Sequence, residues 1–321
     1  MRTRHNGHGP SRDGAHTAGF QHEAMFHAGD AEFLEGALAF IGEGLDAREP
    51  ILVAVRGRRV RLLERELRDS ERVLFADMER VGANPARIIP AWRRFLDERA
   101  ARDQPVRGVG EPIWPGRPAA ELSECERHER LLNLAFDSNR AFRLLCPYDT
   151  TVLDDAVLAG AYANHPLLTR AGRATPNERF LAAASAFDGE LPPPSATPYE
   201  LAFDAHQLAQ VRAFMAEAAY STPISGARGE DLVVAVNELA TNSITHGGGE
   251  GRLLVWMDGD TLMCEVRDGG CIADPLAGRT RPSPDALTGR GLWLVNNLCD
   301  LVEIRSAPDT GTAVRVHMLA A

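Results

Sequence analysis

Two polar side chains on one predicted helix offer the clearest chemistry in the sequence. Glu238 and Asn242 lie four residues apart within NELATNSITHG, residues 237–247. In a helix this spacing places one side chain above the other on the same face. A carboxylate and an amide aligned in this way can hold a hydrated cation or orient a nucleophile. The pattern alone does not separate that chemistry from an ordinary solvated helix face.

A second stretch, RDGG at 267–270, could recognise a flat ring. Asp268 stands where a predicted strand ends, and an acidic side chain in that place can accept a hydrogen bond from an exocyclic amine. The glycines after it, Gly270 among them, leave the backbone bare enough for a ring to approach. Taken alone this motif is a weak signal, because glycines after a strand are usually turn residues.

A third stretch, TGRGLWLV at 288–295, could bind an anion. Gly289, Arg290 and Gly291 come directly before a helical run. Glycines at the N-terminus of a helix expose backbone N–H groups and the positive end of the helix dipole, and Arg290 adds a formal charge. Phosphate groups fit a site of this kind.

The elements that must position these residues can be read from periodicity. Apolar residues recur at the spacing of a buried helical stripe, at Val233, Val236, Leu239, Ala240 and Ile244. The segment 252–270 predicts a hairpin with Asp258-Gly259 as its turn, and we expect the loop 272–288 to act as a lid. The other predicted elements here are a helix over 204–220 with Asp204 as N-cap, and strands over 301–306 and 312–318 joined by the turn 308–311, with Thr312 directly after Gly311.

Helical and extended segments alternate with a short period in the N-terminal half, which predicts a mostly parallel sheet covered by helices. The run ILVAV at 51–55 is apolar throughout, as a strand buried on both faces requires. The other predicted strands cover 73–78, 106–111 and 142–149. The predicted helices cover 30–45 with Asp30 as N-cap, 57–69, 84–101 with Asn84 as N-cap, 121–136, 153–163 and 176–187.

The polar residues of this half that could form a site show no spacing that dictates chemistry. They are His22, His27, Arg107, Glu111, Cys146, Tyr148, Asp149 and His165. A metal ion could bind between His22 and His27, or between Cys125 and His128, but we expect structural or surface roles by default.

Composition excludes several classes of protein. All 35 basic residues are Arg, so there is no phosphate loop of the GxxxxGK[ST] type, no strand lysine of a eukaryotic-type protein kinase and no Schiff-base lysine. The net charge of -10 argues against nucleic acid as the principal partner. No run of about eighteen apolar residues could cross a bilayer, and the five cysteines form no CxxC pair. We therefore expect a cytoplasmic protein with reduced thiols.

A compositional break divides the chain. Residues 191–198, LPPPSATP, favour an extended and semi-rigid spacer. It separates a predicted domain over 20–190 from a second over 199–321. Residues 1–19 carry basic side chains but no apolar segment, and we expect them to form a disordered tail rather than a secretory signal.

The order of the four C-terminal motifs is more specific than any one of them. The order is ExxxN on a helix, DGG after a hairpin, GRG before a helix, and GT before the last strand. In this order they resemble the ATP-binding domain of the GHKL superfamily over about residues 200–319, and NELATNSITHG is similar to its anti-sigma-factor serine kinases. The resemblance implies a Bergerat-type α/β sandwich that binds ATP and Mg²⁺. The roles it implies are Asn242 as Mg²⁺ ligand, Asp268 and Thr312 at the adenine, Gly270 beside the ring, Gly289, Arg290 and Gly291 at the phosphates, His246 as a further nucleotide contact, and Glu238 as general base.

Three short segments of the N-terminal half carry a looser resemblance. HEAMFH at 22–27, LLCPYD at 144–149 and YANHP at 162–166 are similar to the MEDS class of sensory domains, which are α/β input modules of bacterial regulators. The resemblance implies that this half senses a small ligand, whose identity it does not reveal.

Together the two resemblances imply a cytoplasmic regulator in which a sensory module controls an ATP-binding anti-sigma factor with serine kinase activity. The expected partners are an alternative sigma factor and an anti-sigma antagonist protein, without direct contact to nucleic acid or membrane, and a homodimer stays open. One alternative is a non-catalytic module in which ATP only shapes a partner surface. The other is a sensor histidine kinase relative, although a Pro-rich linker precedes the domain and His206 stands alone in its first helix.

Overall fold

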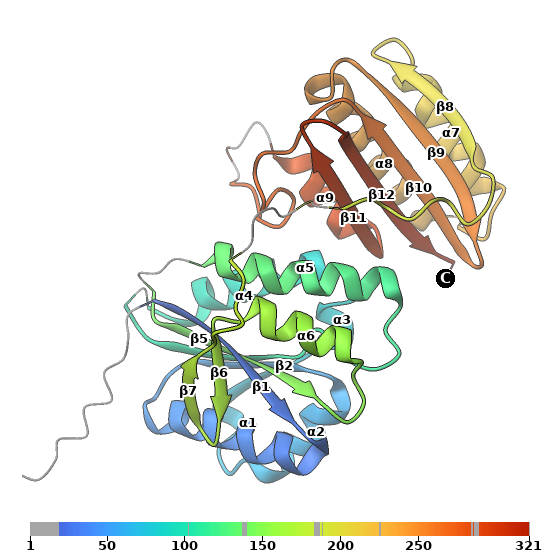
Figure 1. Ribbon diagram of the computed structural model, residues 1–321. Coiled ribbons are helices and arrows are strands. Elements are labelled where there is room, and N and C mark those ends of the chain that lie inside the picture. The colour runs from blue at the N-terminus through green and yellow to red at the C-terminus, as the bar shows by residue number, and fades with distance from the viewer. Residues whose placement is uncertain are drawn as a thin grey trace, which may run out of the picture.

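The computed structural model of the chain describes residues 19–101, 103–136, 140–182, 187, 189–224, 226–283, 285 and 289–320. Two β-sheets organise these residues (Figure 1). One sheet takes its strands from the N-terminal half and the other from the residues after the Pro-rich segment. Apart from Gly19, the predicted disordered tail lies outside the described residues.

The N-terminal sheet has seven strands in the order β3-β2-β4-β5-β1-β6-β7. Neighbouring strands pair in parallel, except that β6 and β7 form an antiparallel hairpin at one edge. This arrangement confirms the predicted, mostly parallel sheet. The strands are β1 (Phe20–His27), β2 (Ile51–Val55), β3 (Val73–Asp77), β4 (Val106–Gly110), β5 (Phe142–Asp149), β6 (Leu167–Arg170) and β7 (Arg173–Pro176).

Helices cover both faces of this sheet, so that the strands between them are apolar throughout, as in β2 (Figure 1). One face packs against α1 (Gly29–Asp46) and α2 (Gly57–Glu66). The other packs against α3 (Met78–Val81), α4 (Ile88–Arg99), α5 (Ala119–Ala135) and α6 (Asp155–Asn164). Two short 3₁₀ helices, η1 (Ser70–Arg72) and η2 (Pro85–Arg87), complete this half.

The second sheet has five antiparallel strands in the order β11-β12-β10-β9-β8. Three helices pack on one face and enclose a single apolar core, which gives the expected α/β sandwich (Figure 1). The elements are β8 (Tyr199–Asp204), α7 (Leu208–Tyr220), α8 (Ala227–His246), β9 (Glu250–Asp258), β10 (Thr261–Asp268), α9 (Arg290–Leu298), β11 (Leu301–Ala307) and β12 (Gly311–Leu319).

Two predicted N-caps are wrong. Helix α1 begins one residue earlier than predicted, after Ala28, whose N–H donates to Glu32 Oε2 at 2.7 Å, while Asp30 pairs with Arg58. Helix α7 follows Gln207, because Asp204 instead ends strand β8. In both places an acidic residue close to the helix start predicted the cap, but a neighbouring partner takes its carboxylate.

Other predictions differ in their bounds. The predicted helix over 176–187 is wrong for 176–182, where β7 ends and no helix follows, and its residues 183–186 lie outside the described chain. The predicted helix over 84–101 divides into η2 and α4, and Asn84 caps the first turn as expected by accepting the Ala86 N–H at 3.0 Å. Strand β1 was not predicted, although it lies between β5 and β6.

The Pro-rich segment lies without helix or strand between the two halves. It is attached to the second sheet on the face opposite the helices, where Arg315 Nη2 donates to the Pro192 carbonyl at 2.6 Å. Within the part of the chain that the structure describes, no helix has the length and apolar character needed to cross a membrane.

Candidate functional site

Helix α8 brings two of the predicted site residues, Asn242 and His246, to one cavity wall. Its buried stripe, with Leu232, Val236 and Leu239, faces the sheet and fixes the rotation of the helix. Asn242 and His246 then line the cavity, with Asn242 half-buried and His246 exposed at the last turn.

Asp268 and Thr312 meet because strands β10 and β12 pair in a register that places them opposite each other. The Asp268 carboxylate accepts the Ser243 hydroxyl at 2.6 Å through Oδ2 and the Gly270 N–H at 2.8 Å through Oδ1. Both carboxylate oxygens are therefore held in place, and each keeps a lone pair for a further donor.

A directed chain of hydrogen bonds fixes Thr312. The Ile272 N–H donates to Ser306 Oγ at 2.8 Å, and Ser306 Oγ lies 2.8 Å from Thr312 Oγ1. Thr312 Oγ1 donates to the Gly270 carbonyl at 2.9 Å, so the Ser306 hydroxyl is the donor to Thr312. Thr312 is 6% exposed, and its hydroxyl has one fixed orientation at the cavity floor.

Gly270 is required by the close approach of β10 to the end of α8. A Cβ at this position would lie 2.6 Å from the His246 carbonyl oxygen and 2.9 Å from Gly247 Cα. Any larger residue would push the Asp268 turn away from α8, so the bare backbone keeps this side of the cavity open for a flat ligand.

The N-terminus of α9 forms the opposite wall. Gly289 has φ = 83°, in the left-handed region, and starts the helix there. At Gly291 a Cβ would lie 3.0 Å from Glu238 Oε2 and 3.2 Å from Asn242 Nδ2. The positive end of the α9 dipole therefore lies directly beside the Glu238 and Asn242 side chains.

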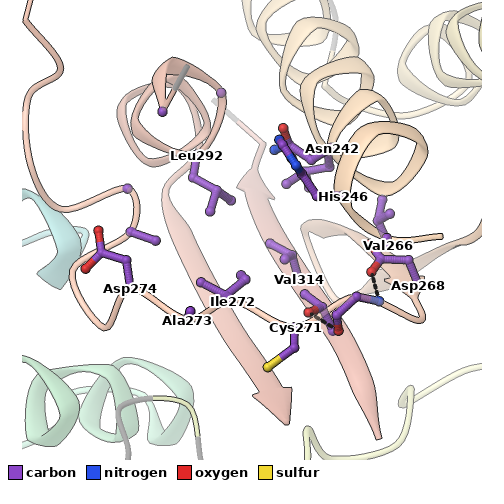
Figure 2. Close-up of a pocket in the computed structure, with 18 of the residues that line it drawn as sticks. Asn242, His246, Val266, Asp268, Cys271, Ile272, Ala273, Asp274, Leu292 and Val314 are labelled. Carbon is purple, nitrogen blue, oxygen red and sulfur yellow. Dashed lines mark hydrogen bonds between the residues drawn. The ribbon is translucent and has the colours of Figure 1, made fainter. Parts of the chain in front are cut away.

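These walls enclose a cavity of about 630 Å³ (Figure 2). The predicted residues that line it are Asn242, His246, Asp268, Gly270, Gly289, Gly291 and Thr312. Glu238 and Arg290 are not among its lining residues, although both adjoin residues that are. Apolar side chains cover the rest of the wall, chiefly Leu239, Val266, Ile272, Leu292 and Val314. A cavity with apolar walls and a few oriented polar groups is typical of a small-molecule site.

Sequence reasoning missed two of the supporting residues, Ser243 and Ser306. Ser243 lies within NELATNSITHG without an assigned role, and Ser306 belongs to none of the motifs. Each supports a site residue from another element: Ser243 on α8 binds Asp268, and Ser306 on β11 binds Thr312. The place of Ser243 on the apolar stripe of the predicted helix, three residues after Ala240 and four after Leu239, is a sequence signal that could have indicated it.

The N-terminal half contacts the C-terminus of the helix that forms the cavity wall. Arg87, at the end of η2, donates to the carbonyl oxygens of Asn296 at 2.7 Å, Asn297 at 3.0 Å and Cys299 at 2.7 Å. Asn84 Nδ2 also donates to Asn296 O at 3.0 Å. The last carbonyls of a helix lack partners within it, so these contacts cap α9 from outside its own domain.

A second contact joins the two halves through one buried carboxylate. Glu124 on α5 accepts from Arg279 Nη2 at 2.9 Å, from Arg305 Nη1 at 3.1 Å and from Arg127 Nε at 3.2 Å. Burial lowers the pKa of Arg127 to about 10 and also lowers the pKa of Arg279, while the Glu124 charge opposes both shifts. Arg279 lies in the loop between Gly278 and Thr280, which line the cavity.

The polar candidates of the N-terminal half separate into three groups. Arg107 binds Glu49, Glu43 and the Phe40 carbonyl, which is a structural role. Glu111 and Asp149 both bind Arg59, at 2.8 and 3.3 Å, with the His27 ring 4.0 Å from Asp149. The third group contains His22, Cys146 and His165, with the Tyr148 ring beside His165.

Neither of the metal-binding pairs suggested by the sequence is formed. His22 and His27 are five residues apart on β1 and face opposite sides of the sheet, because side chains alternate along a strand. Cys125 Sγ donates to the Pro112 carbonyl at 3.3 Å, and among the described residues neither Cys125 nor His128 belongs to a cluster of metal-ligating groups.

Comparison with known proteins finds one matching family model for each half. Residues 21–166 match the family model of the MEDS domain, described as the methanogen/methylotroph, DcmR sensory domain. Residues 201–318 match that of the histidine kinase-like ATPase domain, which implies ATP binding, typically with Mg²⁺. No match was found among curated proteins. The two matches support a fusion of a MEDS sensory domain to a histidine kinase-like ATPase domain, an architecture that indicates a signalling regulator.

Proposed function

We propose that the protein is an ATP-dependent anti-sigma factor with serine kinase activity towards an antagonist protein, and that its N-terminal half regulates this activity. The observation that carries the proposal is the cavity in which an amide, a carboxylate, a bare glycine turn and a helix N-terminus meet. The partners, an alternative sigma factor and the antagonist, follow from the likeness of the NELATNSITHG stretch to the anti-sigma kinases.

One end of the cavity suits an adenine ring. Asp268 is held by Ser243 and Gly270, so it can accept a hydrogen bond from an exocyclic amine without first being reoriented. The oriented Thr312 hydroxyl lies on the paired strand, and Val266 and Val314 give the ring apolar contacts. Gly270 leaves the space that a side chain would fill.

The other end suits the phosphates and a cation. Asn242 would ligate Mg²⁺ through Oδ1, since this ion keeps several waters and takes few protein oxygens. The N-terminus of α9, with Gly289 and Gly291 on the cavity wall, is a favourable place for the negatively charged phosphates. ATP bound with Mg²⁺ supplies the phosphoryl group. Glu238 stands one turn before Asn242 and would accept the proton of a substrate hydroxyl.

Regulation by the N-terminal half is supported by where that half makes contact. Arg87 holds the C-terminus of α9, whose N-terminus forms the phosphate end of the cavity. Glu124 holds Arg279 of the loop beside the cavity, and Arg93 Nη1 donates to Thr280 Oγ1 at 2.6 Å. A rearrangement in the sensory half would therefore reach two walls of the ATP cavity.

Incubation with radiolabelled ATP, with and without candidate antagonist proteins, tests the proposal. Label on a Ser or Thr of the antagonist, lost in Glu238→Gln, is the expected result. Label on a His of the protein itself would instead make it a histidine kinase. Absence of label, despite measured ATP binding and sigma-factor binding, would leave a non-catalytic binding module and overturn the kinase assignment.

A further inference from the structure

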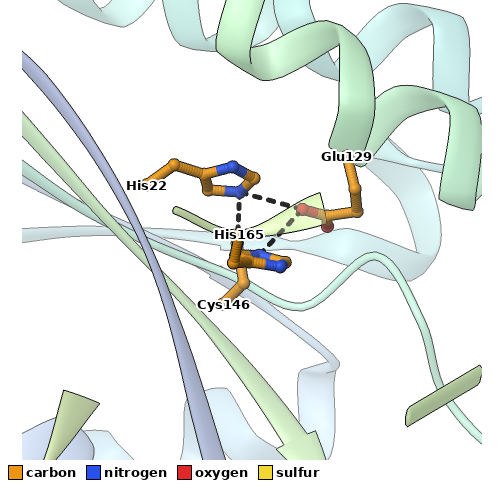
Figure 3. A group of neighbouring side chains, drawn as sticks. All are labelled: His22, Glu129, Cys146 and His165. Carbon is orange, nitrogen blue, oxygen red and sulfur yellow. Dashed lines mark hydrogen bonds and ion pairs between the residues drawn. The ribbon is translucent and has the colours of Figure 1, made fainter. Parts of the chain in front are cut away.

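Four buried side chains in the MEDS half converge on one point (Figure 3). They are His22 on β1, Glu129 on α5, Cys146 on β5 and His165 directly after α6, and none is more than 1% exposed. Their ligand atoms all lie within 4.8 Å of one another. The cluster lies outside the ATPase domain and takes no part in the function proposed above.

The sheet register explains how residues distant in sequence come together. In the parallel pair β1–β5, His22 lies opposite Leu144 and Ala24 lies opposite Cys146. Paired residues share a face, so His22 and Cys146 project from the same side of the sheet. Helix α5 covers that side and supplies Glu129, and the end of α6 supplies His165.

Hydrogen bonds on the outer side of each imidazole determine which nitrogen faces the cluster. His165 Nδ1 lies 2.8 Å from the Ala161 carbonyl, which can only accept, so Nδ1 carries a hydrogen. His22 Nδ1 lies 3.1 Å from Asn133 Oδ1. The amide of Asn133 is oriented by its Nδ2, which donates to the Asn164 carbonyl at 2.8 Å, so His22 Nδ1 also carries a hydrogen. In a neutral ring the Nε2 atom of each histidine then carries no hydrogen and presents a lone pair.

Both of these lone pairs are directed at a carboxylate oxygen. His22 Nε2 lies 2.9 Å and His165 Nε2 lies 3.2 Å from Glu129 Oε2, and Cys146 Sγ lies 3.5 Å from His22 Nε2. Lone pairs that face an anion at these distances repel it unless a positive charge lies among them. Within the described chain, His165 Nε2 and Glu129 Oε1 have no hydrogen-bond partner although both are buried. Buried polar atoms without partners are costly, and a shared cation would satisfy them.

We propose that His22, Glu129, Cys146 and His165 bind one divalent transition-metal ion of the Zn²⁺ class. Imidazole nitrogen, thiolate sulfur and carboxylate oxygen are the donors that Zn²⁺ takes, and four protein ligands complete a closed tetrahedral site. Ligand bonds of about 2.0 to 2.3 Å place tetrahedral donors about 3.3 to 3.6 Å apart. Three of the six donor separations, at 2.9, 3.2 and 3.5 Å, are close to those values, and the remaining ones, all within 4.8 Å, would shorten when the ion binds.

Charge and donor type narrow the choice of ion. One thiolate and one carboxylate carry two negative charges, so a divalent ion makes the buried cluster neutral. Nitrogen and sulfur donors disfavour Mg²⁺ and Ca²⁺, which take oxygen ligands. The outer hydrogen bonds of His22 to Asn133 and of His165 to Ala161 are of the kind that orients metal-binding imidazoles.

Cobalt substitution of the full-length protein tests the site. The protein is unfolded with a chelator, refolded, and titrated with Co²⁺. We expect one equivalent to bind tightly and to give a thiolate-to-cobalt charge-transfer band, which Zn²⁺ then removes by displacement. Cys146→Ser should abolish this band. Cys125→Ser is the matched control, because Cys125 is equally buried on the same side of the sheet but lies outside the cluster, and it should keep the band.

The proposal fails if the refolded wild-type protein, with native circular dichroism, binds no Co²⁺, or if the charge-transfer band persists in Cys146→Ser. X-ray absorption of the Zn²⁺-loaded wild type gives an answer that does not depend on the folding of any variant. One sulfur and three nitrogen or oxygen neighbours support the site, whereas no sulfur or more than one contradicts it.

Discussion

Replacement of Asp268 by Asn separates recognition of the base from stability of the fold. The Asn side chain can keep Oδ1 towards the Gly270 N–H and turn Nδ2 towards Ser243 Oγ. The Ser243 hydroxyl then has a second acceptor available, the Leu239 carbonyl at 3.3 Å. Because every polar atom keeps a partner, we expect the free energy of unfolding to change by less than about 1 kcal/mol.

The nucleotide, in contrast, loses a charged acceptor. A hydrogen bond to a charged group contributes roughly 1.5 to 3 kcal/mol, and a neutral one roughly 0.5 to 1.5 kcal/mol. The difference of about 1 to 2 kcal/mol corresponds to ATP binding weaker by about 5- to 30-fold. Preference for ATP over GTP should also fall, because an amide can donate to the guanine carbonyl as a carboxylate cannot.

Isothermal titration of ATP and GTP, with urea unfolding of the same preparations, measures both effects. Asp300→Asn is the control. Asp300 likewise accepts from a backbone N–H, that of Leu319 at 2.7 Å, and from a side chain, that of Arg228, but it does not line the cavity. Unchanged ATP affinity in Asp268→Asn, or an equal loss in Asp300→Asn, would refute the assignment of Asp268 to the base.

Three further predictions concern single side chains. Asn242→Ala should weaken MgATP binding far more than binding of ATP without metal, and equal losses in titrations with and without Mg²⁺ would exclude a metal ligand. Glu238→Gln should keep ATP affinity within a few fold and lower phosphoryl transfer by roughly 10² to 10⁴, whereas a lower melting temperature with normal transfer would leave it a structural role. Glu303 is buried, which alone would raise its pKa, but His317 at 2.9 Å and nearby Arg residues hold that pKa below its usual 4.5. The ionised Glu303 side chain thus contributes its full stabilisation above pH 4.5, and this contribution is lost as the pH falls through the lowered pKa. The free energy of unfolding, measured in urea, should therefore decrease less in acid for Glu303→Gln than for the wild type.

The parts of the fold that could be predicted are those whose pattern is local. Strand β2 is apolar at every position, and the β9–β10 hairpin has alternating side chains around a Gly turn, so short-range sequence determined both. The order of the four C-terminal motifs indicated an ATP site, and each motif contains residues whose type is set by the local backbone conformation. Gly289, for example, has the positive φ that its place at the start of α9 requires.

The parts that could not be predicted depend on distant partners. Strand β1 contains two buried polar residues, His22 and Glu23, and therefore lacks the apolar pattern of a buried strand. The Glu23 carboxylate accepts hydrogen bonds from Arg143 at 2.7 Å and from Thr169 at 2.6 Å, partners that are distant in sequence. The metal-ligating cluster is hidden for the same reason, since Glu129 stands 107 residues from His22 in the chain. No local spacing encodes such a contact. The sheet register and the packing of α5 create it.

Helix α5 connects this cluster to the ATPase domain. Glu129 takes part in the cluster, and Glu124, five residues earlier on the same helix, binds Arg279 and Arg305 of the other half. The two carboxylates are separated by about 7.5 Å of helix, a length over which backbone hydrogen bonds keep a helix rigid. Loading or loss of an ion at Glu129 that displaces α5 must therefore also displace Glu124, and with it the Arg279 loop at the ATP cavity. Together with the proposed regulation, this gives a physical path from the cluster to the Arg279 loop at the ATP cavity, through one helix and the buried Glu124 carboxylate.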